Sequence, residues 1–296
     1  MTLPELSRSR ASHDHASVWW QPAILVLLTA WLYAPIASRL IEEWWHDPDY
    51  MYGFVVPAFA LFLVWESRSR LAALTPKPSW WGLSILLFAL LALAVGAASS
   101  EFFLPRISLL LLITGVVLFF GGWSYLRVIV FPLIFLVLMI PSTTIYNHLT
   151  LPLQLLASKA ACALLNLLAI PAAREGNIIL LPAAQMEVAE ACSGIRSLFT
   201  LITLAIIYGH LCEKRNGLRV LLVLAAVPVA VVANILRVTA TGIFVQRWGV
   251  RAAEGTVHLL SGWLIFVVCL AMIFGFHAIL KRLLTNRQEA ATQGVA

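Results

Sequence analysis

The stretch LRVLLVLAAVPVAVVANILRVTATGIFV, residues 218–245, decides the fold class of this chain. Its only charged side chains are Arg219 and Arg237, and the run is longer than the ~20 apolar residues that a helix needs to cross a bilayer. Eight further apolar runs accompany it, so we predict an all-α polytopic membrane protein. In chain order these other runs are Trp19–Leu40, Tyr52–Trp65, Trp80–Ala98, Phe103–Phe120, Ser124–Ile140, Leu151–Ile170, Cys192–Leu211 and Val257–Leu280.

The overall composition supports this class and excludes several others. Of the 296 residues, 61% are hydrophobic and 11% are charged, and the mean hydropathy is +0.91, whereas soluble domains are about 25% charged. A disordered chain, a soluble nucleic-acid-binding domain and a secreted disulfide scaffold are therefore excluded. The net charge of +6 is interpreted as a topology signal, because Lys and Arg accumulate in cytoplasmic loops. The cysteines lack paired spacing, so we expect neither a metal site nor a disulfide framework; they are Cys162, Cys192, Cys212 and Cys269.

Loop charges convert the nine runs into a predicted topology. Basic residues place the loops at 66–79 and 213–219 in the cytoplasm, and the acidic segment 39–50 is assigned to the outside. Residues 141 and 192 then both lie outside, so the run 151–170 cannot cross. We predict it as an interfacial or re-entrant helix, and its polar stripe agrees with this; the stripe consists of Gln154, Ser158, Lys159 and Asn166.

The predicted architecture is one membrane-embedded domain over residues 19–280. It has about eight transmembrane helices, and cytoplasmic tails are expected at 1–18 and 281–296. Strand character is confined to residues 177–188, where two short apolar segments flank Pro182-Ala183-Ala184. This pattern predicts a short external β-hairpin.

Cys192 opens the predicted span 192–211 at its external end. Positions four apart share a helix face, so we expect Cys192 and Arg196 to lie together in the first turn. There the helix dipole and the guanidinium would both favour the thiolate. The alternative is structural, with Cys192 as a small packing residue and Ser193 as the helix cap.

Arg237 and His258 are delivered to the same external face by the next two spans. An arginine in an apolar run needs a partner or an aqueous cavity, and Asn234 and Thr241 share its helix face; the alternative is an arginine that extends to the interface. A lone histidine at a helix start, such as His258, is often only a satisfied interfacial residue. Together, Cys192, His258 and Arg237 supply a nucleophile, a proton donor for a leaving amine and a cation for an oxyanion.

Two nearby carboxylates complete the candidate site. Glu187 and Glu190 are predicted to orient Arg237 or His258, or simply to keep the hairpin solvated. The chemistry of the site needs no metal and no cofactor.

These blocks give the chain a resemblance to the exosortases, of the exosortase/archaeosortase family of membrane cysteine transpeptidases. The resemblance runs from about Trp44 to Leu280. It is carried most specifically by EVAEACSGIR at 187–196, with Asn234-x-x-Arg237 and then His258 followed by Gly262 in the same order. The chain departs from the family at Met51-Tyr52-Gly53, where relatives commonly show Ser-His-Gly.

The resemblance implies a Cys-Arg-His active site at Cys192, Arg237 and His258, with Arg196 as an accessory residue and Asn234 beside the site. It also implies substrates with a C-terminal sorting signal, which consists of a short motif such as Pro-Glu-Pro, one transmembrane helix and a basic cluster.

We therefore expect a cysteine protease or transpeptidase of the bacterial inner membrane, with its active site on the periplasmic face. The expected partners are exported proteins with that signal, membrane lipid, and an acyl acceptor that is an amine or water; nucleic acid is not expected. The alternative is a non-enzymatic protein of polysaccharide export or transport, whose arginine and histidine line a polar path. A membrane acyltransferase would need a His-Asp pair on the outer face, which the sequence does not place there.

Overall fold

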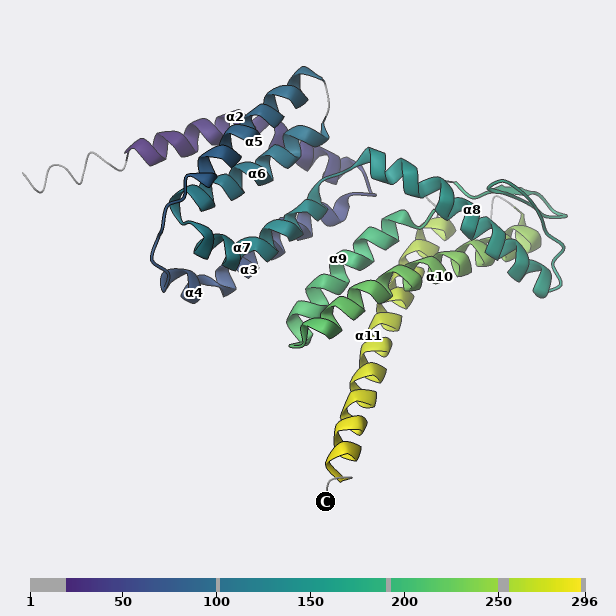
Figure 1. Ribbon diagram of the computed structural model, residues 1–296. Helices are drawn as coiled ribbons and strands as arrows, with labels where there is room; N and C mark the ends of the chain where they lie inside the picture. Colours follow the sequence, from purple (N-terminus) through teal and green to yellow (C-terminus); the bar gives the residue numbers. More distant parts are fainter. Residues whose placement is uncertain (1–19, 100–101, 190–192, 250–255, 294–296) are drawn as a thin grey trace, which may run out of the picture. The chain divides into compact units, whose positions relative to one another are not determined.

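The computed structural model describes residues 20–99, 102–189, 193–249 and 256–293, with the backbone alone at 20–23, 25, 256–259 and 285–293. The chain divides into two compact units, Met1–Pro141 and Ser142–Ala296. Both are built mainly from helices (Figure 1). The predicted site residues Glu190 and Cys192 lie outside the described residues, and His258 is described by its backbone only.

The first unit is entirely helical where it is described. Its elements in chain order are α2 (Trp20–His46), η1 (Met51–Phe54), α3 (Val55–Glu66), α4 (Arg68–Ala72), α5 (Trp81–Ala98), α6 (Phe103–Phe120), α7 (Trp123–Phe135) and η2 (Leu136–Met139).

Close packing of α5 and α6 dominates this unit. A Cβ on Gly82 would collide with the backbone of Phe119, so the helices meet there through a residue without a side chain. Small residues permit such close approach between apolar helices, where no water is available to be expelled. Side-chain hydrogen bonds attach α2 to the rest of the unit, including the bond from Arg106 of α6 to Glu43. The Tyr33 and Ser108 hydroxyls are 3.0 Å apart, and Trp44 Nε1 donates to the Met139 carbonyl at 3.0 Å.

The second unit combines four long helices with a small sheet. Its elements are α8 (Thr143–Leu167), β1 (Ala173–Glu175), β2 (Ile178–Leu180), β3 (Gln185–Glu187), α9 (Ile195–Cys212), α10 (Asn216–Trp248) and α11 (Thr256–Gln293). The strands form an antiparallel sheet in the order β1-β2-β3, with Ile179 opposite Arg174 on one side and Met186 on the other.

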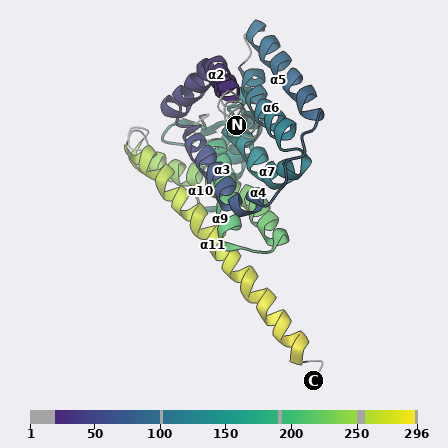
Figure 2. The same cartoon turned by 90° about the vertical axis from the view of Figure 1, so that its left-hand side faces the viewer.

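Two apolar clusters hold the second unit together, and both use α10. The first joins α8, the sheet and the second half of α10, and includes Leu165, Ile179, Val188, Val238 and Val245. The second joins α9, α10 and α11, which lie side by side in Figures 1 and 2, and includes Leu201, Leu222, Ala226, Ala230 and Cys269. The unit is therefore organised around α10.

The fold confirms the predicted class, an all-α polytopic membrane protein. Among the described residues, six helices are long and apolar enough to cross a membrane: α5, α6, α8, α9, α10 and α11. The apolar stretches Met51–Glu66 and Trp123–Met139 are shorter. The count of eight crossings remains a prediction.

Helix α8 differs in its bounds from the interfacial or re-entrant helix that was predicted over 151–170. It begins at Thr143, where Ser142 Oγ accepts a hydrogen bond from the Ile145 N–H at 3.4 Å, and its 25 residues are long enough to span. Part of its polar stripe faces protein, because Gln154 and Ser158 are buried and Ser158 Oγ donates to the Gly176 carbonyl. The side of the membrane on which α8 ends remains a prediction.

The predicted hairpin is confirmed as β2 and β3, and the structure adds β1 as a third strand. The turn at Gly176, which has a φ of +62°, joins β1 to β2. Helix α2 also differs from prediction. It runs to His46 through the segment that was assigned to an external loop from residue 39.

Candidate functional site

The segments that the sequence singled out meet around the middle of α10. A Cβ on Gly194, at the start of α9, would lie 2.7 Å from Asn234 Cγ. A Cβ on Gly262, in the second turn of α11, would lie 3.7 Å from Arg237 Nη2. Asn234 and Arg237 are three residues apart on α10 and therefore lie on one side of it. The start of α9 and the start of α11 thus both adjoin the same turn of α10.

Val188 and Gly194, described residues on either side of 190–192, are both fixed in the second unit. On one flank, Val188 is 1% exposed, donates its N–H to the Asn177 carbonyl at 3.0 Å, and belongs to the same apolar cluster as Val238. On the other flank, Gly194 lies against Asn234. Gly194 therefore adjoins the turn of α10 that presents Arg237, and Val188 packs in the apolar cluster that includes Val238.

The start of α9 corrects one prediction about Cys192. The helix was expected to begin at residue 192, but it begins at Ile195, after Gly194 in the left-handed region with a φ of +81°. The four-residue spacing of Cys192 and Arg196 consequently does not place them on one helix face. Arg196 is exposed in the first turn of α9.

Ser193 has a structural role in this turn. It is 2% exposed, and its Oγ accepts a hydrogen bond from the Ile195 N–H at 3.3 Å. The structural alternative assigned the helix cap to Ser193, but the cap is Gly194. The Ser193 hydroxyl is thus buried and already engaged, which makes it a weak competitor for the role of nucleophile.

Arg237 lines a cavity of about 250 Å³ between α10 and α11. Thr241 and Ser261 add hydroxyl groups, while the other lining residues are apolar: Leu236, Ala240, Phe244, Leu264 and Ile265. A half-buried guanidinium in a mostly apolar cavity is exposed to little water, so its attraction for an anionic group is less screened than at an open surface. The cavity therefore suits a site where negative charge develops.

The structure describes the other predicted site residues in different detail. Asn234 is 4% exposed, as its position beside the start of α9 requires. Glu187 is exposed at the end of β3 and accepts a hydrogen bond from Asn177 Nδ2 at 3.4 Å. His258 lies in the first turn of α11, four residues before Gly262.

Sequence reasoning missed two members of this site. Ser261, which precedes Gly262, was not singled out, although it lines the Arg237 cavity. Gly194 was quoted as part of the cysteine block, although its close approach to Asn234 sets the path of the chain. The Ser-Gly pair before an apolar run was the available sign of a turn at that point.

A second polar cluster lies at the opposite end of α9, α10 and α11. His277 is 4% exposed, and its ring joins the Tyr208 hydroxyl at 2.7 Å to Glu213 Oε2 at 3.3 Å. Glu213 Oε1 also accepts the backbone N–H groups of Lys214 and Arg215. The Arg215 hydrogen bond is the main cause that lowers the pKa of Glu213 below its ordinary value; burial opposes it, and the bonds from His277 and Lys214 add to it.

The remaining cysteines differ in exposure. Cys269 is buried, Cys162 is half-buried with its Sγ 3.3 Å from the Ala172 carbonyl, and Cys212 is exposed at the end of α9. Burial therefore protects the thiol of Cys269 but not that of Cys212, because α9 presents its last residue to the outside of the bundle.

Comparison with known proteins adds a family assignment to this geometry. The family model described as transmembrane exosortase matches residues 44–275. That range begins at Trp44 in α2 and ends in α11, and it includes Asn234, Arg237, Gly262 and the segment 190–192. No curated protein and no solved structure matches the chain.

Proposed function

Because the chain belongs to the transmembrane exosortase family, we propose that it is a membrane cysteine transpeptidase that cleaves C-terminal sorting signals. Its substrates are exported proteins that end in a short motif, a transmembrane helix and a basic cluster. The reaction takes place at the periplasmic face of the bacterial inner membrane.

Cys192 is the nucleophile in this proposal. Its thiolate sulfur bonds to the carbonyl carbon of the scissile peptide, next to the transmembrane helix of the substrate, and the carbonyl electrons move onto oxygen. When the tetrahedral intermediate collapses, the C–N bond breaks and a thioester remains on the enzyme. An acceptor amine or water then attacks the thioester and releases the thiol.

Arg237 and His258 serve this attack in different ways. The Arg237 guanidinium stabilises the oxyanion, since a preorganised cation in a mostly apolar cavity favours charge that develops during the reaction. His258 donates its proton to the departing amine, which leaves with the transmembrane helix. Positions four apart share a helix face, so His258 is expected on the side of α11 where Gly262 meets Arg237.

One observation carries the proposal: Gly194, two residues after Cys192, adjoins the turn of α10 that presents Arg237. Val188 shares a buried cluster with Val238, and Gly194 lies against Asn234. This arrangement supports the assignment of Cys192 and Arg237 to one site. The buried, engaged hydroxyl of Ser193 supports the cysteine as the nucleophile in preference to the neighbouring serine.

The test is co-expression with a reporter that carries such a sorting signal. We expect the wild-type chain to remove the C-terminal helix of the reporter and the Cys192→Ala variant to leave it intact. Ser193→Ala and Cys212→Ala are the matched controls and should retain processing. Full processing by Cys192→Ala would overturn the mechanism, and loss with Ser193→Ala alone would move the nucleophile to the serine. If the chain were instead a polysaccharide-export protein, its activity in cells would not depend on Cys192.

A further inference from the structure

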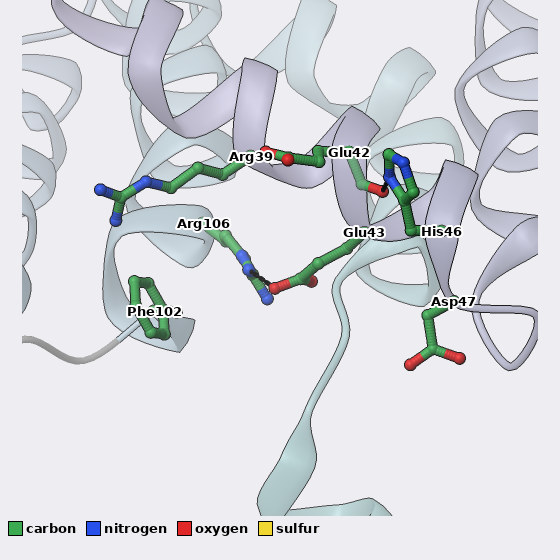
Figure 3. Close-up of a pocket in the computed structure, with 7 residues that line it drawn as sticks. All are labelled: Arg39, Glu42, Glu43, His46, Asp47, Phe102 and Arg106. Carbon is green, nitrogen blue, oxygen red and sulfur yellow. Dashed lines mark hydrogen bonds and ion pairs between the residues drawn. The ribbon is translucent and has the colours of Figure 1, made fainter.

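Most of the cavity beside Arg237 is lined by apolar side chains, to which the proposed chemistry gives no role. Its volume is about 250 Å³. The apolar residues come from both helices: Leu236, Ala240 and Phe244 of α10, and Leu264 and Ile265 of α11. A second cavity, in the first unit, is instead lined mainly by charged side chains (Figure 3). The cavity beside Arg237 is therefore the one that suits an apolar group.

The spacing of the lining residues shows how two helix faces form this cavity. Ala240 and Phe244 follow Leu236 at intervals of four, and Ala240 lies three positions after Arg237, so all four share one side of α10. On α11, a Cβ on Gly262 would lie 3.7 Å from Arg237 Nη2. The guanidinium and the apolar side chains therefore adjoin the same space between α10 and α11.

The cavity opens at the surface of the helix bundle. Three of its apolar side chains are exposed, namely Leu264 at 68%, Leu236 at 47% and Phe244 at 41%. Both α10 and α11 are long and apolar enough to cross a membrane, so exposed apolar side chains on them face lipid. A substrate that is anchored by a transmembrane helix can therefore reach the cavity from the side, without leaving the bilayer.

Covalent geometry links the oxyanion to one side chain of the substrate. In the residue that supplies the scissile carbonyl, only Cα separates the side chain from the carbonyl carbon. Because Arg237 holds the oxyanion in the proposed mechanism, this side chain lies close to the guanidinium and meets the apolar walls of the cavity. An apolar cavity of about 150 Å³ accepts a benzene molecule, so a cavity of about 250 Å³ has room for a leucine or phenylalanine side chain beside the carbonyl oxygen.

Charged side chains fit this cavity poorly. A lysine would bring a second positive charge next to the Arg237 guanidinium, in a space that is exposed to little water. An aspartate would pair with the guanidinium in the bound substrate and compete with the oxyanion for it. Binding energy that is gained equally before the transition state does not accelerate the reaction, so an aspartate should lower KM and kcat together.

We propose that the cavity beside Arg237 is a specificity pocket, which binds a large apolar side chain of the residue whose carbonyl is attacked. This inference rests on the proposed function, since it takes Arg237 as the group that holds the oxyanion. Ala240 sets the size of the pocket, because it is the smallest of the described residues that line it. The enzyme therefore selects its cleavage site partly by the residue just before the scissile bond.

The experiment measures cleavage of a purified sorting-signal reporter by the full chain in nanodiscs. The cleavage site is first mapped by mass spectrometry, and the residue that supplies the scissile carbonyl is then varied. We expect kcat/KM for phenylalanine or leucine to exceed that for alanine by roughly tenfold or more, because even one methylene group in an apolar pocket is worth about tenfold. Lysine should lower kcat/KM below the value for alanine.

A substitution in the pocket should change this preference. Ala240→Phe should reduce the ratio of the phenylalanine and alanine values of kcat/KM by roughly tenfold or more, because the new ring occupies the space for the substrate side chain. Both values are measured on one variant, so a loss of folded protein cancels in the ratio. Ala271→Phe is the matched control and should leave the ratio unchanged, since Ala271 is an exposed alanine of α11 outside the cavity.

A second arm tests binding without catalysis. A reporter with the photoreactive residue benzoylphenylalanine at the same position is bound to Cys192→Ala and irradiated. We expect cross-links to residues 236–244 and 261–265, and fewer of them when Ala240→Phe is added. Equal kcat/KM for the phenylalanine and alanine reporters, or a ratio that Ala240→Phe does not change, would overturn the pocket. If cleavage still required Cys192, the proposed function would stand, whereas no cleavage of any reporter by the wild type would overturn both.

Discussion

Replacing Gly194 by alanine tests how the chain enters α9. The new Cβ would lie 2.7 Å from Asn234 Cγ and 2.8 Å from Asn234 Cβ, whereas carbon atoms in contact prefer about 3.5–4.0 Å. A new rotamer of Asn234 moves Cγ but not Cβ, so the side chain cannot clear the overlap by rotation. Either the start of α9 or this turn of α10 has to move.

The expected cost has two parts. A left-handed φ costs an L-residue ~1–2 kcal/mol, and overpacking a buried contact costs a further ~1–3 kcal/mol. The sum is about 2–5 kcal/mol, which corresponds to a fall in melting temperature of roughly 5 °C or more. Because the displaced turn also leads into residues 190–192, we expect processing of a sorting-signal reporter to be largely lost.

Gly176→Ala is the matched control. Gly176 also has a positive φ, +62°, but a Cβ there would meet nothing within 4 Å, so this variant carries the backbone strain without the overlap. The assay compares thermal unfolding of both detergent-purified variants by tryptophan fluorescence, together with reporter processing in cells. Equal falls in melting temperature and normal processing by Gly194→Ala would refute the reasoning about the contact with Asn234.

Four further predictions follow from the site, the topology and the second polar cluster. Arg237→Lys and Arg237→Ala should lower the processing rate by roughly 100- to 1,000-fold, as loss of an oxyanion donor does elsewhere, and near-normal rates with alanine would make Arg237 an interfacial anchor. A membrane-impermeant maleimide applied to intact cells should label the wild type but not Cys192→Ala, and persistent labelling would place another thiol outside. Reporter fusions after residues 146 and 175 should both report the outside, and opposite reports would make α8 a crossing helix. Hydrogen bonds lower the pKa of Glu213. The stability that ionised Glu213 gives to the folded state should therefore be present above the ordinary pKa of a glutamate and lost as the pH falls through the lowered value. Glu213→Gln should flatten this pH dependence of thermal unfolding, and an unchanged dependence would contradict the assignment.

The helices that the sequence predicted best are those with abrupt polar ends. The run Phe103–Phe120 coincides with α6, and Trp80–Ala98 differs from α5 by one residue, because apolar runs of this length leave the backbone no alternative to internal hydrogen bonds in lipid. The start of α9 was harder to predict. Its position depends on the left-handed Gly194 and on a contact with Asn234 of another helix. The hydropathy pattern of the sequence indicates neither feature.

The candidate residues were identifiable from chemistry, but their surroundings were not. Arg237 stands out because a charge in an apolar run is costly. The cavity that it shares with Phe244 and Ser261 depends on how α10 and α11 are rotated against each other, which two uniformly apolar helices do not reveal. The pair of Arg106 and Glu43 was equally hidden, since the two residues are 63 positions apart and both were assigned to solvent-exposed loops.

The length of α10 sets the depth at which the proposed chemistry takes place. The helix has 33 residues, and at 1.5 Å per residue it is about 50 Å long, well beyond a hydrocarbon core of about 30 Å. Its two arginines within the apolar run, Arg219 and Arg237, are 18 positions apart, or about 27 Å along the axis. With Arg219 at one boundary of the hydrocarbon, Arg237 therefore reaches the opposite boundary. In the proposed mechanism, the scissile peptide bond would then lie at the water line, so that cleavage would need neither a water channel into the bilayer nor unwinding of the substrate helix.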